Sequence, residues 1–106
     1  MIVKEKEVFY KSVPDGAYFY GMTVIVEGRF QLLMWNDLLG VEGTDTEVKM
    51  IFRLYDVTIR GSGLLQLFRD AKRHKIDVLT ATPRHVSMMG GEGMVIESIQ
   101  VKEVQA

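Results

Sequence analysis

The stretch YFYGMTVIVEGRFQLLMW, residues 18–35, decides the fold class of this chain. Its even positions from Tyr18 to Val26 are all apolar, so one face of this segment is expected to be buried at the period of a β-strand. Glu27-Gly28 then provides a tight turn, because glycine readily takes a positive φ. A second strand follows from Arg29 to Trp35, and the two strands are predicted to form a hairpin.

The second strand of this hairpin is apolar on both faces. Phe30, Leu32 and Met34 share one parity, and Leu33 and Trp35 share the other. A strand of this kind is either central in a sheet or covered by a helix or by a partner chain.

Two further strands are predicted to bend. The segment from about 47 to 60 changes the parity of its apolar residues, which predicts a bulge or sharp bend near Leu54-Tyr55-Asp56. The last strand, from about 94 to 104, changes parity between Ile96 and Ile99 in the same way. Additional strands are expected over about 3–13 and 76–82, and residues 36–46 are expected to form a loop.

One helix is predicted between these strands. Ser62 is a suitable N-cap, and the apolar residues Leu64, Leu67, Phe68 and Ala71 recur at helical spacing until the helix ends near Lys75. The expected architecture is therefore α+β: a single domain, residues 1–106, with a strongly bent, mostly antiparallel sheet of five or six strands. The helix packs across this sheet, which resembles a half-barrel. One helix covers only part of such a sheet, so apolar sheet surface is left for another occupant.

The composition excludes several classes of function. The 106 residues include no cysteine and only two histidines, His74 and His85, so disulfides, thiolate metal sites and cysteine nucleophiles are excluded, and no metal or cofactor is expected. The N-terminus alternates charged residues where a signal peptide needs an apolar stretch, and no apolar run is long enough to span a bilayer. We expect a cytoplasmic protein that does not bind membranes.

The net charge of −1 results from two opposed regions. Residues 60–85 contain six basic and two acidic residues, whereas the rest of the chain contains seven basic and twelve acidic residues. One basic and one acidic surface would suit self-association or the capture of an anion, although solvated charges give the same pattern.

A candidate anion site lies where the predicted strand meets the helix. A glycine turn that opens a helix presents free backbone N–H groups and the positive end of the helix dipole. The predicted ligand-binding residues are Arg60, Gly61, Ser62, Gly63, Arg84 and His85. The dinucleotide fingerprint is incomplete because its third glycine would fall at Gln66, and the glycines at 90–93 lack the lysine of a phosphate loop.

No complete catalytic set is present, and an enzyme is not the favoured interpretation. Asp70 lies one helical turn before His74, but this spacing is common on solvated helices. The favoured function is a small interaction module that works as a homodimer through its leftover apolar sheet surface. The alternative is a binder of a small anionic ligand, or a minor enzyme, with its site between the sheet and the helix N-terminus. A third interpretation, nucleic-acid binding through the basic helix, conflicts with the isoelectric point near 6.1.

Overall fold

The computed structural model describes residues 10–12, 19–82 and 93–104. Within these ranges the strands form two four-stranded sheets. The first contains, in hydrogen-bonded order, β1 (Tyr10–Ser12), β7 (Ile76–Thr80), β2 (Gly21–Val26) and β3 (Arg29–Met34). The second contains β4 (Leu38–Gly43), β5 (Glu47–Phe52), β6 (Tyr55–Ser62) and β8 (Val95–Glu103). A 3-10 turn, η1 (Trp35–Asp37), connects the sheets, and the helix α1 (Leu65–Lys72) follows β6.

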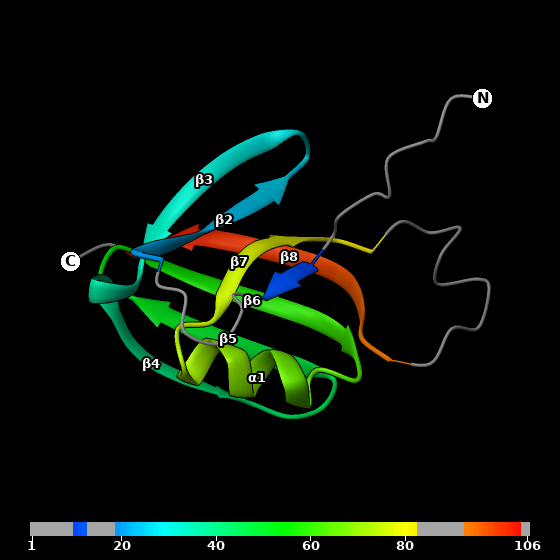
Figure 1. Ribbon diagram of the computed structural model, residues 1–106. Helices are drawn as coiled ribbons and strands as arrows, with labels where there is room; N and C mark the ends of the chain where they lie inside the picture. Colours follow the sequence, from blue (N-terminus) through cyan, green and yellow to red (C-terminus); the bar gives the residue numbers. More distant parts are fainter. Residues whose placement is uncertain (1–9, 13–18, 83–92, 105–106) are drawn as a thin grey trace, which may run out of the picture.

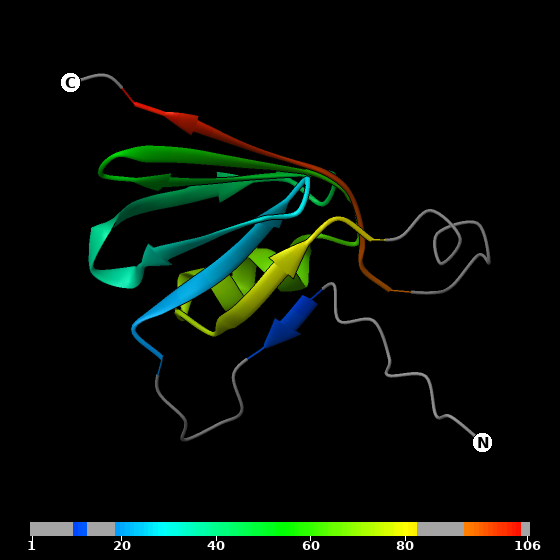
Figure 2. The same cartoon turned by 90° about the horizontal axis from the view of Figure 1, so that it is seen from above.

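The predicted α+β class is confirmed. Among the described strands only the β2–β7 pair is parallel, and both sheets are curved without closing into a barrel. The sheets face each other, and α1 packs against β4, β5 and β7 at one side of the space between them (Figures 1 and 2). The architecture differs from the expected single sheet, because the chain passes from one sheet to the other at η1.

The hairpin predicted around Glu27-Gly28 is confirmed. β2 and β3 pair antiparallel from Gly21↔Met34 to Val26↔Arg29. Glu27 and Gly28 have φ values of 50° and 77°, and two positive values are typical of the type I′ turn that matches the twist of a hairpin.

β3 is an edge strand of the described sheet rather than a central one. Its odd-numbered face turns inward, where Leu33 is buried, as is Trp35 just beyond the strand. The even-numbered face is exposed and carries Phe30, Leu32 and Met34. The apolar residues on both faces of this strand are thus not explained by burial within the described part of the chain.

Of the bulge or sharp bend predicted near Leu54, the structure has the sharp bend, and the single strand predicted over about 47–60 is two strands, β5 and β6. A two-residue turn at 53–54 separates β5 from β6, which pair antiparallel with Ile51 opposite Asp56. A tight turn shifts the parity of the buried residues just as an inserted residue does, and Arg53-Leu54 contains none of the usual turn residues.

The bend predicted in the last strand is confirmed. Arg60 lies opposite Ser98, whereas Gly61 lies opposite Ile96, so Glu97 is the extra residue of a bulge.

The expected loop at 36–46 is wrong, because residues 38–43 form β4. The glycines and the acidic residue of β4 interrupt the alternation of apolar residues that identifies a strand. The predicted N-terminal strand is described only at residues 10–12.

Helix α1 is shorter than predicted at both ends. Its N-cap residue is Leu64 rather than Ser62, and no side chain of the cap residue bonds to the helix. At the other end His74 has a φ of 58°, and the backbone N–H groups of His74 and Lys75 donate to the carbonyls of Ala71 and Asp70. These two bonds form a Schellman motif, in which His74 occupies the left-handed position usually taken by glycine.

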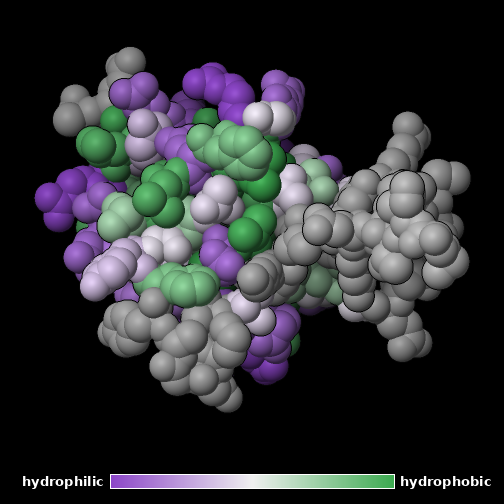
Figure 3. Space-filling view, turned by 45° about the horizontal axis from the view of Figure 1, so that its top comes forward, coloured by the Kyte–Doolittle hydropathy of each residue, from purple (hydrophilic) through white to green (hydrophobic). Residues whose placement is uncertain are grey.

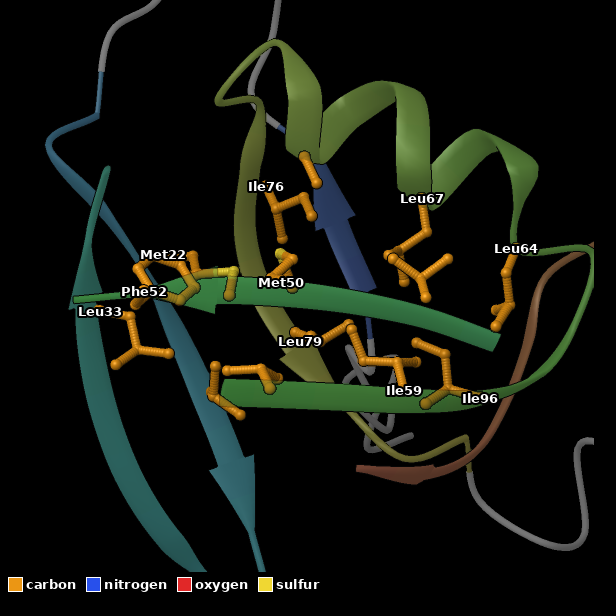
Figure 4. Close-up of a cluster of buried hydrophobic side chains, with 14 of the residues drawn as sticks. Met22, Leu33, Met50, Phe52, Ile59, Leu64, Leu67, Ile76, Leu79 and Ile96 are labelled. Carbon is orange, nitrogen blue, oxygen red and sulfur yellow. The ribbon is translucent and has the colours of Figure 1, made fainter. Parts of the chain in front are cut away.

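The core lies between the sheets and under α1, as Figure 4 shows. Met22, Met50, Ile59, Leu67 and Ile96 are fully buried and come from β2, β5, β6, α1 and β8. Fully burying one such side chain stabilises a fold by roughly 1.5–3 kcal/mol. The core therefore holds both sheets and the helix together and fixes the surfaces described below.

Candidate functional site

The N-terminus of α1, the predicted anion site, already holds a carboxylate from the chain itself. The backbone N–H groups of Gly63 and Leu65 donate to the Asp45 carboxylate at 3.3 and 3.2 Å, and that of Leu64 donates to the Asp45 backbone carbonyl at 2.9 Å. Asp45 lies in the turn between β4 and β5, so it caps the helix from a distant part of the chain. An external anion would have to displace this carboxylate.

The other residues predicted for the anion site are only partly brought together. Arg60 and Ser62 are both exposed at the end of β6, and the Arg60 guanidinium pairs with the Glu47 carboxylate at 3.1 Å. Arg84 and His85 lie outside the described residues. The anion site at this position therefore stays a prediction. The residues that the structure describes contain no group of three or more metal-binding side chains.

A cleft lies between the two sheets, at the end of β6 that is farther from α1. Its volume is about 490 Å³. Tyr55, at the start of β6, lines this cleft, and Ser62, at the end of β6, lies next to the N-terminus of α1. At about 3.3 Å per residue along the strand, the cleft and the helix N-terminus are roughly 23 Å apart. The lining consists of Val24, Val26, Glu27, Arg29, Phe30, Gln31, Tyr55, Val101 and Glu103.

The cleft combines an apolar floor with a polar rim of mixed charge. Val24 is buried, and Val26 and Val101 are half-buried. Arg29 and Gln31 lie opposite Val26 and Val24 and thus share the inward face of the hairpin. Among the described residues of the lining, no nucleophile is paired with a base. The cleft is not visible in the sequence, because residues from β2, β3, β6 and β8 form it jointly.

Within the described residues, the outer edge of β3 has no paired strand, and it presents backbone groups together with apolar side chains. The backbone N–H of Trp35 donates to the Tyr20 carbonyl at 2.8 Å, so the odd-numbered residues direct their backbone groups toward β2. The even-numbered residues Phe30, Leu32 and Met34 then direct theirs toward the free edge. Their exposed fractions are 76%, 63% and 37%. Figure 3 shows hydrophobic residues gathered on this face of the molecule, with hydrophilic residues around them.

β3 lacks the devices by which proteins usually protect an edge strand. It contains no proline, no lysine and no bulge, and its one charged residue, Arg29, stands at its start. An open edge of this kind is a template for pairing with another strand. We call the three residues Phe30, Leu32 and Met34, with their free backbone groups, the β3 edge.

Comparison with protein-family models, with curated proteins and with solved structures gives no match for this chain. No helix in the part of the chain described here is long and apolar enough to cross a membrane.

Proposed function

We propose that this protein is a homodimeric interaction module in which the β3 edge pairs antiparallel with the β3 edge of a second copy. The observation that supports the proposal is the coincidence of free backbone and exposed apolar side chains at the same three residues. Pairing would satisfy the backbone groups and remove the apolar side chains from water at the same time.

The side chains of the β3 edge are complementary to themselves under twofold symmetry. If the axis passes through Leu32, each Phe30 lies opposite Met34 of the second copy, and thioether–aromatic contacts are favourable. All three residues of the edge then pair. Each Arg29 lies about six residues from the equivalent arginine, so the pairing keeps the two arginines apart.

The proposal is tested by the mass of the protein in solution. Light scattering coupled to gel filtration should give a dimer that dissociates on dilution. Leu32→Lys places a charge at the centre of the pairing and should weaken dimerisation by at least about tenfold, since like charges directly opposite are destabilising. Leu54→Lys is the matched control, because Leu54 is 57% exposed in the β5–β6 turn.

Circular dichroism of both variants checks that each is folded. A native protein that is monomeric at high concentration would contradict the proposal, as would a Leu32→Lys variant that dimerises as strongly as Leu54→Lys.

A second candidate function is supported by the cleft between the sheets. Its volume of about 490 Å³ falls within the range of about 300–1,000 Å³ that is typical of small-molecule sites. Two carboxylates and one guanidinium on the rim favour a neutral or zwitterionic amphipathic ligand over a simple anion. In a thermal-shift screen of such metabolites, a hit at this site should be lost in Val101→Trp, which fills the cleft, and kept in Val104→Trp, whose residue lies outside the cleft lining. A hit that survives Val101→Trp binds elsewhere.

A further inference from the structure

The first sheet presents a largely apolar surface on the side that faces away from the core. Residues directly opposite each other in neighbouring strands point to the same face of a sheet. Val24 and Leu79 pair with each other and are buried in the core, so the residues that alternate with them face outward. We call this surface the outer face, and it consists of two rows across β7, β2 and β3: Thr80, Ile25 and Phe30, and Val78, Thr23 and Leu32.

The outer face has the composition of a surface that another layer covers. None of its six residues is charged. The Thr80 hydroxyl donates to the Ile25 carbonyl at 3.0 Å, so burying it would leave no unsatisfied donor. The outward side of the second sheet differs, because Lys49 and Asp56 form an ion pair there at 3.7 Å. A sheet that is solvated on one side has polar residues on that side, whereas apolar residues on both sides indicate a second covering layer.

The outer face of one copy is too small to hold a partner firmly. Three strands of about six residues, spaced by about 4.8 Å, give a flat area of roughly 290 Å². Specific and stable protein–protein interfaces bury roughly 600–1,000 Å² on each partner. A single outer face therefore falls well short of what a stable contact needs.

Pairing of two β3 edges would double this surface. In that pairing Leu32 lies opposite Leu32 of the second copy, and side chains directly opposite each other in an antiparallel pair share one face. The two outer faces then join into one surface with a flat area of roughly 580 Å². This area approaches the lower limit for a stable interface, and the surface that matches it in size and in its lack of charge is the same surface of a second dimer.

We propose that two dimers pack through their joined outer faces and form a tetramer. This inference rests on the proposed pairing of the β3 edges, because only that pairing doubles the surface. Two sheets that pack face to face interdigitate their side chains at a separation of about 10 Å. Such a contact closes the assembly by twofold symmetry, so no outer face remains exposed.

Sedimentation velocity over a concentration series tests the proposal. The native protein should form dimers at low concentration and tetramers at higher concentration. Ile25→Lys places charges in the joined face without altering β3, so dimers should persist and their association into tetramers should weaken by at least about tenfold. Leu32→Lys should prevent both steps, since Leu32 belongs to the β3 edge and to the outer face.

Ile51→Lys is the matched control. Ile51 is also a half-buried isoleucine that points outward from its sheet, but it lies on β5 in the second sheet, opposite Asp56. This variant should form dimers and tetramers like the native protein. Ile25→Thr is a milder change that keeps a β-branched residue in the strand, and it should weaken the association of dimers by about fourfold. Circular dichroism shows whether each variant is folded.

The outcomes separate this inference from the proposed function. A native protein that dimerises but forms no tetramer overturns the tetramer and leaves the pairing of the β3 edges standing. Tetramers of Ile25→Lys that are as stable as those of Ile51→Lys also overturn it. A native protein that stays monomeric contradicts both proposals. If Ile25→Lys is monomeric while Leu32→Lys still dimerises, the outer faces pair directly and both proposals are wrong.

Discussion

β3 and β8 are each one of the two outer strands of their sheets in the described residues, yet their edges are very different. β8 contains a bulge at Glu97 and two more exposed charged residues, Lys102 and Glu103. β3 has a regular register and exposed apolar side chains. Bulges and charges prevent strands from pairing with other chains, so the comparison indicates that β3 is more open to a partner than β8.

The largest loss of stability is expected from a substitution where β8 pairs with β6. A Cβ on Gly61 would lie 1.9 Å from the carbonyl oxygen of Val95, a contact that only a shift of the backbone can relieve. Gly61→Ala should therefore lower the free energy of unfolding by about 3 kcal/mol. Urea denaturation measures this loss. Gly40→Ala is the control, because a Cβ at that position meets no atom within 4 Å. Equal stability of the two variants would show that the bulge does not need a glycine.

A smaller loss is expected at the turn that holds β3. Gly28 has a φ of 77° and no atom within 4 Å of an added Cβ, so the cost of Gly28→Ala is conformational rather than steric. We expect a loss of about 1 kcal/mol in the free energy of unfolding. Gly28→Asn should lose less, since asparagine tolerates this conformation. If asparagine and alanine destabilise equally, backbone strain is not the cause.

The smallest change in stability is expected from removing the charges that protect β8. Glu97→Val combined with Lys102→Val alters two exposed side chains and should change the free energy of unfolding by less than about 0.5 kcal/mol. Association should nevertheless increase, which light scattering over a concentration series measures. Unchanged association would mean that the bulge alone protects this edge.

The sequence predicts the local structure well where one signal has one cause. Alternating apolar residues and Gly28 predict the first hairpin, and the parity change between Ile96 and Ile99 predicts the bulge in β8. The same parity change near Leu54 results from a tight turn instead. The pattern does not separate the two causes, because both move the buried face by one residue.

The candidate sites were harder to predict because they join distant segments. Asp45 caps a helix whose first residue, Leu65, is 20 positions later in the chain, and no local pattern indicates this contact. The stacking of Trp35 on His74 also depends on the tertiary fold. Only the β3 edge left a sequence signal, since a strand with apolar residues on both faces needs a second covering surface.

The cap that Asp45 supplies to α1 also has a consequence for the order of folding. An eight-residue helix is too short to persist alone in water, and this one depends on a carboxylate from the turn between β4 and β5. The β4–β5 hairpin must therefore form before the helix is secured. We expect Asp45→Ala to accelerate unfolding while leaving the folding rate nearly unchanged, with a φ-value near zero in stopped-flow kinetics. A folding rate that falls instead would place α1 in the folding nucleus.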